Sequence, residues 1–280
     1  MKFSSPRQLK DWINNYSKKN NVISNTILQN YMMERLLERI SLSPYHDNFI
    51  LKGGFLITSL VGSNLRSTLD IDTTIKGFPV TREKIEKIVQ AILLIDIDDN
   101  VSFQLNEIKN IRNTGEYEDF RALLTAHFFN MSVNMKLDIT TGDEIIPREI
   151  EYGFKLMFED RSINIKAYNI ETILSEKIES ILARNVANTR ARDYYDVYIL
   201  SILRNKDYKQ LDVQDAIRKK AKERGTEVYL NNWKKYLNDI EENTDLRHIW
   251  NSYCKKYPYA NGINFNLVID SIRKLLEELK

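Results

Sequence analysis

A glycine pair followed by two alternating aspartates is the feature that most constrains how this chain folds. Lys52-Gly53-Gly54 follows a short apolar run, and Asp70 and Asp72 come later, after a short apolar stretch and a polar loop. Residues two apart in a strand point to the same face of the sheet. The spacing therefore predicts that Asp70 and Asp72 share one side of a strand, while Leu69 and Ile71 face the core.

Two adjacent carboxylates repel each other unless a cation lies between them, and a divalent metal is the usual cation. Mg²⁺ held by carboxylates and substrate phosphates is typical of phosphoryl and nucleotidyl transfer sites. Gly53 and Gly54 would let backbone N–H groups approach a phosphate, and a helix from Phe55 would point its positive end at that anion. An ordinary structural turn and a surface pair of aspartates remain the alternative interpretation.

Composition limits the class of protein. The 280 residues are 42% hydrophobic and 29% charged, which allows one large domain or two modest ones with a real core. No apolar run approaches the roughly 18 residues of a membrane span, and the first residues have no apolar signal core. The single cysteine, Cys254, excludes an internal disulfide and favours a reducing, cytoplasmic location.

The first half of the chain alternates between helical and strand patterns. Helices are expected from about residue 5 to 40, from 55 to 61, and from 81 to 94, where Thr81 is placed to cap the last of them. Strand patterns cover residues 49–51, 69–75, 101–111, 122–129 and 131–139. This order predicts an α+β core over residues 45–165 behind a helical lead-in over residues 1–44, together forming a first domain of residues 1–165.

A third carboxylate follows from the last of these strand patterns. Apolar residues alternate with Asn134, Lys136 and Asp138, so Asp138 lies on the polar face of a half-buried strand. It could join Asp70 and Asp72 in holding a metal or accepting a proton. An ordinary aspartate at a strand end is equally consistent with the pattern.

Residues 166–280 are predicted to form a helical second domain. Asn169 is placed to cap a helix that carries Lys177, and the next helix opens near Arg190, where Asp193 and Asp196 share one face.

Basic residues and aromatics are interleaved further along, although the net charge of the whole chain is only +2. Basic patches beside aromatic rings bind RNA through phosphate contacts and base stacking. A solvated helix face backed by a buried aromatic stripe is the alternative. The residues concerned are Arg218, Lys219, Lys220, Lys222, Arg224, Lys234, Lys235, Lys255 and Lys256, with Tyr229, Trp233, Tyr236, Trp250, Tyr253 and Tyr257.

Four motifs in this order resemble the AbiEii/AbiGii toxin family. They are Gly53-Gly54, the loop Ser63-x-x-Arg66-x-Thr68-x-Asp70-Ile71-Asp72, Glu176-Lys177-Ile178, and Arg190-x-Arg192-Asp193-x-x-Asp196. The resemblance covers residues 45–200 and implies a nucleotidyltransferase fold related to the DNA polymerase β-like transferases. Its members are toxins of bacterial type IV toxin–antitoxin or abortive phage-infection systems.

The resemblance also implies a role for each matching residue. Asp70 and Asp72 correspond to the metal-binding carboxylates of the family, and Asp138 to its third strand carboxylate. Lys177 would contact the triphosphate, and Asp193 corresponds to an essential late acid, with Arg192 where the family often has lysine. Gly53, Gly54, Ser63, Arg66 and Thr68 would surround the nucleotide phosphates.

The implied reaction is attack by a hydroxyl on the α-phosphate of an NTP, with Mg²⁺ or Mn²⁺ as the cofactor and pyrophosphate released. Asp138 or Asp193 would be the base. The implied acceptor is RNA, notably the tRNA 3′ end, with growth arrest as the outcome and an antitoxin that need not bind the toxin. A small-molecule or protein acceptor, and a non-catalytic nucleotide- or RNA-binding regulator, remain alternatives.

Overall fold

The computed structural model describes residues 2–78, 80–112, 118–277 and 279. The chain divides into two compact units. The first comprises Met1–Asp143 and Glu149–Tyr168, and the second comprises Glu144–Arg148 and Asn169–Lys280. The expected boundary after residue 165 falls within strand β7 (Ser162–Ala167). Because Ala167 still pairs with Leu51 of the sheet, the first unit extends to Tyr168.

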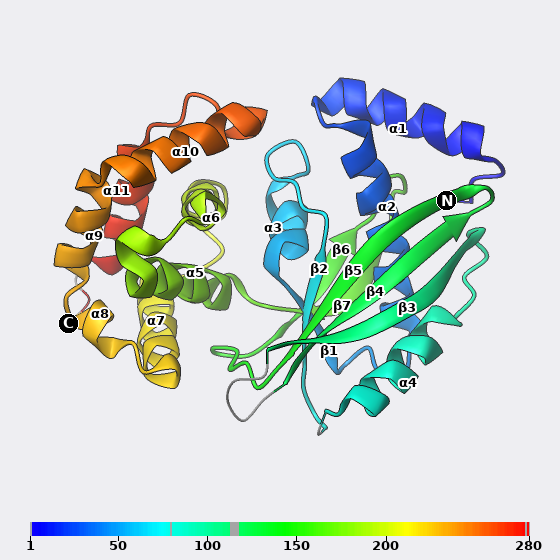
Figure 1. The fold of residues 1–280 in the computed structure, drawn as a ribbon, viewed down its shortest axis with the longest axis horizontal. Helices are drawn as coiled ribbons and strands as arrows, with labels where there is room; N and C mark the ends of the chain where they lie inside the picture. The colour runs from blue at the N-terminus through cyan, green and yellow to red at the C-terminus, as the bar shows by residue number, and fades with distance from the viewer. Residues whose placement is uncertain (1, 79, 113–117, 278, 280) are drawn as a thin grey trace. The chain divides into compact units, whose positions relative to one another are not determined.

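Among the described residues of the first unit, seven strands form one mixed sheet in the order β3-β4-β5-β2-β1-β7-β6 (Figure 1). Strands β3, β4 and β5 form an antiparallel meander, and β2 lies parallel to β5 but antiparallel to β1. β1 is parallel to β7, which forms a hairpin with β6. The bounds are β1 Phe49–Lys52, β2 Ile71–Ile75, β3 Val101–Arg112, β4 Asp119–Phe128, β5 Met131–Thr141, β6 Ile150–Lys155 and β7 Ser162–Ala167.

The expected strands are all present, whereas β6 and β7 were not expected. The alternation in β5 is confirmed, because Met135, Leu137 and Ile139 are buried on one face. In β7, Ile163 and Ile165 are buried while Ser162 and Asn164 are exposed, but the strand is short and follows a turn. A run of this length is a weak signal on its own, since pairing with β1 is what stabilises it.

The described residues of the first unit also form four helices: α1 (Pro6–Asn20), α2 (Ser24–Leu42), α3 (Gly53–Val61) and α4 (Arg82–Leu93). The predicted cap of α4 is confirmed, because the Thr81 hydroxyl accepts a hydrogen bond from the Lys84 N–H at 3.3 Å. Helix α2 contacts β5, β7 and α4, and α4 contacts β3. Helix α3 starts directly after β1 and contacts β1 and β2, so its first residues lie next to the strand that carries Asp72.

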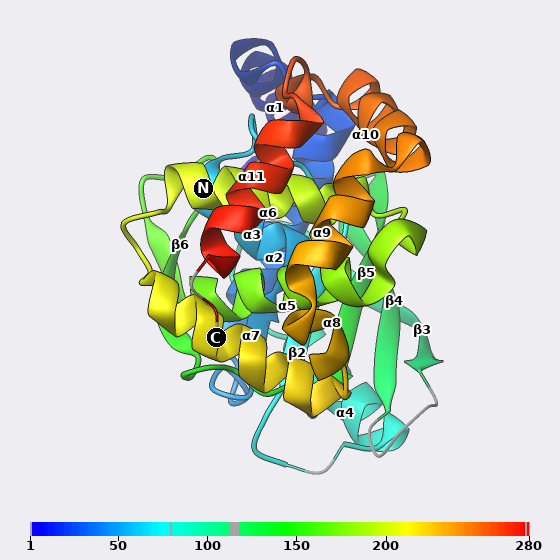
Figure 2. The ribbon, with the colours of Figure 1, turned by 90° about the vertical axis from the view of Figure 1, so that its left-hand side faces the viewer.

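The described part of the second unit is helical (Figure 2). Its central helix α5 begins after Asn169, whose side chain accepts the Thr172 N–H at 2.7 Å, so the predicted cap is confirmed. Helix α5 contacts α6, α7, α8 and α9. The bounds are α5 Ile170–Arg184, α6 Ala191–Leu203, α7 Gln210–Arg224, α8 Glu227–Asn231, α9 Trp233–Glu242, α10 Thr244–Lys256 and α11 Phe265–Leu276.

Within the ranges that the structure describes, no helix is long and apolar enough to cross a membrane.

Candidate active site

Asp72 lies in the central strand β2, and Asp70 lies just before it. Both side chains are half-buried. The prediction for Leu69 is wrong, because its side chain is 51% exposed, whereas Ile71 is fully buried as expected. Strand β2 starts only at Ile71, so the alternation of a strand does not extend back to Leu69. Asp70 is therefore held by the loop before β2, next to Asp72 in sequence but outside the sheet ladder.

The glycine pair is required because the first residues of α3 lie very close to Asp72 of β2. Gly53 has φ +65°, and a Cβ added there would lie 2.1 Å from Asp72 Oδ2. A Cβ at Gly54 would lie 2.8 Å from the Thr68 hydroxyl oxygen. The Gly54 N–H, at the start of α3, donates to Asp72 Oδ2 at 3.3 Å. Only glycine allows the first turn of the helix to lie so close to the carboxylate.

Four charged residues form a row across adjacent strands. Arg121 of β4 pairs in register with Asp138 of β5, Asp138 with Asp72 of β2, and Asp72 with Lys52 of β1. Arg121 donates two hydrogen bonds to Asp138, from Nε to Oδ1 and from a terminal nitrogen to Oδ2, both at 2.7 Å. Lys52 makes an ion pair with Asp143. A cation therefore lies at each end of a pair of neighbouring carboxylates.

Burial raises the pKa of Asp72 above its usual range, and the neighbouring Asp138 raises it further. Lys52 and the Gly54 N–H act in the opposite direction, towards a lower pKa. The ionised form of Asp72 therefore lacks full compensation, and a divalent cation bound there would supply it.

The carboxylates fit a magnesium ion that also binds substrate phosphates. Mg²⁺ is usually held by one or two carboxylates plus phosphate oxygens, and Asp70 and Asp72 supply that number. In the described part of the chain, no group of three or more His, Cys, Asp or Glu side chains is arranged to hold a metal. Both oxygens of Asp138, the third predicted metal ligand, accept hydrogen bonds from Arg121.

The loop after α3 contributes two buried polar side chains. Arg66 and Thr68 are 1% and 5% exposed, and both lie against Gly54: the Arg66 guanidinium is 3.2 Å from a Cβ added at that glycine. Ser63 is directed elsewhere in this arrangement, because its hydroxyl shares a 2.8 Å hydrogen bond with the Tyr16 hydroxyl of α1. The structure thus brings Gly53, Gly54, Arg66 and Thr68 together beside Asp72, whereas the printed contact of Ser63 is with Tyr16.

The remaining predicted residues lie in the second unit and form a compact ionic cluster. Lys177 of α5 extends its ammonium group to Asp193 Oδ1 at 2.5 Å and to Asp196 Oδ2 at 3.2 Å, both on α6. Asp193 and Asp196 are buried on the same face of α6, as their spacing predicted. Lys177 is therefore the cation that compensates two buried carboxylates.

The interpretation of the C-terminal basic segment needs correction at several positions. Lys220 is fully buried, where its ammonium donates to the Glu144 carbonyl at 3.0 Å and pairs with Glu223 at 2.7 Å. Trp233, Trp250 and Tyr253 are buried in the helical core and do not present faces to a ligand. The structure thus favours the aromatic stripe as core, because these rings lie on the apolar faces of their helices. The lysines that remain exposed are Lys219, Lys222, Lys234, Lys235, Lys255 and Lys256.

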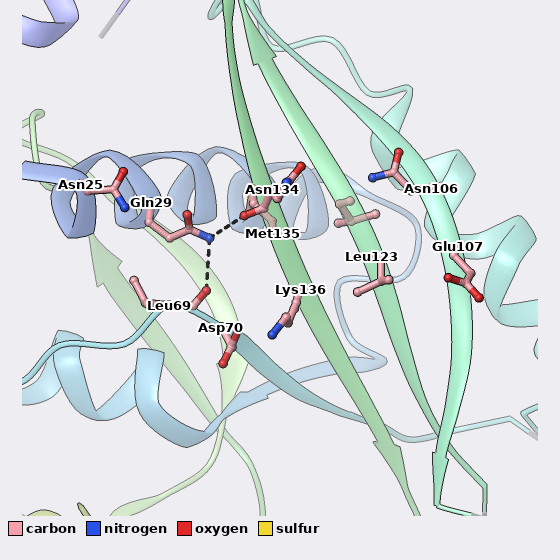
Figure 3. A pocket seen from close by; sticks show the side chains of 11 residues that line it. Asn25, Gln29, Leu69, Asp70, Asn106, Glu107, Leu123, Asn134, Met135 and Lys136 are labelled. Carbon is pink, nitrogen blue, oxygen red and sulfur yellow. Dashed lines mark hydrogen bonds between the residues drawn. The ribbon is translucent and has the colours of Figure 1, made fainter.

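A pocket of about 540 Å³ opens beside Asp70 on the first unit (Figure 3). Asp70 and Lys136 form part of its lining, and four amide side chains surround them. No local sequence pattern pointed to a role for Lys52, Arg121 or these amides. The alternation in β5 did place Asn134 and Lys136 on the face of Asp138, but the other residues come from distant segments.

A family of known proteins matches most of the chain. The model of the family described as nucleotidyl transferase AbiEii toxin, type IV TA system, matches residues 35–277. No curated protein matches the chain.

Two solved structures from Helicobacter pylori are similar to the chain. A crystal structure of a candidate nucleotidyltransferase superposes with a TM-score of 0.50 at 15% identity, covering 92% of this chain and 97% of that one. The structure of JHP933 has a TM-score of 0.49 at 13% identity, covering 91% and 93% of the two chains. At 15% identity, the first similarity bears on the fold alone.

Proposed function

Because the chain belongs to the AbiEii nucleotidyltransferase toxin family of type IV toxin–antitoxin systems, we propose that it transfers a nucleoside monophosphate from an NTP to an RNA. The proposed acceptor is the 3′ end of a tRNA, and the outcome is growth arrest that serves phage defence. Family membership itself implies an antitoxin and a nucleotide substrate. The identity of the RNA and the need for Mg²⁺ are parts of the proposal.

The approach of Gly53 and Gly54 to Asp72 is the observation that carries the proposal. It brings a half-buried carboxylate, the N-terminus of α3 and the buried Arg66 together within one small region. Helix N-termini and guanidinium groups bind phosphate, and carboxylates bind the cation that accompanies it. A carboxylate, a helix N-terminus and a guanidinium group together suit the phosphates of a nucleoside triphosphate and their cation.

Asp70 and Asp72 would hold Mg²⁺ or Mn²⁺, which supplies charge neutralisation on the phosphates and a lower pKa for the attacking hydroxyl. Thr68, Arg66 and the backbone at Gly54 would bind and orient the phosphates. The acceptor hydroxyl attacks the α-phosphorus, a new P–O bond forms, and the bond to pyrophosphate breaks.

The hydroxyl proton passes to a base, and Asp138 and Asp193 remain the two candidates. Each already accepts hydrogen bonds from a cation, Arg121 in one case and Lys177 in the other. Arg121 would hold Asp138 in position for the transfer, and Lys177 orients Asp193 within the second unit.

The exposed lysines of the second unit are the proposed docking surface for the RNA. Lys219 and Lys222 lie on α7, beside the buried Lys220. Reversal of both exposed charges (Lys219→Glu with Lys222→Glu) should weaken RNA binding and reduce its dependence on salt, while nucleotide binding stays unchanged. An RNA affinity that is the same in both proteins at low and moderate salt would contradict this surface.

A transfer assay tests the activity. The protein is mixed with total tRNA, Mg²⁺ and each α-³²P-labelled NTP in turn, alongside the variants Asp70→Asn and Asp72→Asn. Asp11→Asn is a matched control, because Asp11 is exposed on α1 and is distant in sequence from the site. We expect label on tRNA with one NTP, loss of label in both site variants and with EDTA, and full transfer in the control.

Two results would contradict the proposal. Transfer that persists in Asp72→Asn would place the chemistry elsewhere in the chain. Absence of label on any RNA, with label on a protein or small molecule instead, would refute the RNA acceptor while leaving the transferase activity intact.

A further inference from the structure

The pocket beside Asp70 is formed where the chain leaves the sheet. Strands β2 and β5 pair from Ile71 and Leu137 onward, and before Ile71 the chain diverges from β5. Gln29 of α2 spans the resulting gap: its Nε2 donates to the Leu69 carbonyl at 3.2 Å and to the Asn134 carbonyl at 3.0 Å (Figure 3). The two hydrogen bonds of Gln29 therefore hold the wall of the pocket in place.

A β-bulge directs an additional side chain into the pocket. Leu105 pairs with Leu124 and Glu107 with Leu123, so Asn106 is an extra residue in β3. Consecutive residues of a regular strand point to opposite faces, yet both Asn106 and Glu107 line the pocket. Bulges that redirect a side chain in this way are common next to active sites.

The amides are oriented by a chain of hydrogen bonds. Asn106 Nδ2 donates to the Thr125 hydroxyl at 2.8 Å, and that hydroxyl donates to Asn134 Oδ1 at 3.2 Å. These bonds leave Asn106 Oδ1 as an acceptor and Asn134 Nδ2 as a donor. The pocket thus offers an amide acceptor and an amide donor oriented by hydrogen bonds, together with the exposed ammonium of Lys136.

We propose that this pocket binds a nucleobase. Asparagine and glutamine amides match the alternating donors and acceptors of base edges, and single-stranded bases are read in this way. The half-exposed Leu69 at the pocket wall supplies an apolar surface that a planar base would cover. The volume falls in the range of about 300–1,000 Å³ of small-ligand sites.

The inference rests on the proposed function for its source of bases. Asp70 belongs both to the pocket lining and to the proposed metal site, so a base bound here adjoins the reacting phosphates. The base belongs either to the incoming NTP or to the terminal nucleotide of the acceptor RNA. The KM values of a pocket variant for the NTP and for tRNA separate the two sources.

Binding is measured first without catalysis. The full chain is titrated in EDTA with adenosine, guanosine, cytidine and uridine by ligand-observed NMR. The variants are Asn106→Ala and Asn134→Ala, both at exposed positions, with Asn110→Ala as the matched control on the same strand as Asn106 and outside the pocket lining. We expect at least one nucleoside to bind, tenfold or more weaker binding in the pocket variants, and less than a twofold change in the control.

The transfer assay then identifies the source of the base. A higher KM for the NTP in Asn134→Ala assigns the pocket to the incoming nucleotide, and a higher KM for tRNA assigns it to the acceptor. Saturable binding that is equal in all variants, or no nucleoside binding by the unmodified chain, would overturn the inference.

Failure of the proposed function would give a different result. If no RNA is labelled, yet nucleoside binding is lost in Asn134→Ala and kept in Asp72→Asn, the pocket assignment stands without the transfer activity.

Discussion

Replacing Gly53 with alanine tests whether the glycine pair positions Asp72. A residue other than glycine with φ near +65° costs about 1–2 kcal/mol. The new Cβ would also lie 2.1 Å from Oδ2, 2.6 Å from Cγ and 2.7 Å from Cβ of Asp72. The Asp72 Cβ cannot rotate away, so the strand or the helix must shift, at about 1–3 kcal/mol for such overpacking. We therefore expect a local loss of stability of about 2–5 kcal/mol.

Gly225→Ala is the matched control. Gly225 has φ +64°, and nothing lies within 4 Å of an added Cβ, so only the backbone cost of about 1–2 kcal/mol applies. Because the two glycines lie in different units, hydrogen exchange of β2 and of α7 reports each loss locally. Transfer activity should be lost in Gly53→Ala and kept in Gly225→Ala. Equal destabilisation by the two changes, with activity retained in both, would show that Gly53 does not position Asp72.

Three further predictions concern charged groups. Arg121→Gln removes a cation next to the carboxylates, so the acidic limb of the pH profile of transfer should move to higher pH. An unchanged acidic limb would show that Arg121 does not favour the ionised form of these carboxylates. Burial raises the pKa of Glu34 from 4.5 to about 8, so the folded state retains a proton that the unfolded state releases. Thermal unfolding should therefore show stability falling from pH 4.5 to about pH 8, and Glu34→Gln should flatten that fall. Lys177→Ala removes the ammonium that pairs with both buried aspartates of α6 and should cost about 3–5 kcal/mol in unfolding free energy, whereas the exposed Lys235→Ala should cost less than about 0.5 kcal/mol.

Features that depend on local sequence were predictable. The caps at Thr81 and Asn169 are set by hydrogen bonds to residues three positions away. The face that carries Asp138 follows from alternation within one strand, and the shared face of Asp193 and Asp196 follows from the helical repeat. Each of these depends on neighbours in the chain alone.

Features that depend on strand pairing were not predictable. Arg121 and Lys52 reach the carboxylates through the register of β4 with β5 and of β1 with β2, which no local pattern specifies. Gln29 contacts two segments that are distant in sequence. The buried position of Lys220 depends on an acceptor at Glu144, so its place within a basic run was misleading.

The two faces of strand β5 separate the proposed base pocket from the hydrophobic core. Asn134, Lys136 and Asp138 face the site, whereas Met135 and Leu137 pack in the core. Under the proposed base pocket, single substitutions at the exposed Asn134 or Lys136 would change ligand preference with little cost to the stability of the sheet. A one-residue insertion before them would exchange the two faces and lose both properties together. Under that proposal, β5 would tolerate substitutions that alter specificity far better than any change in its length.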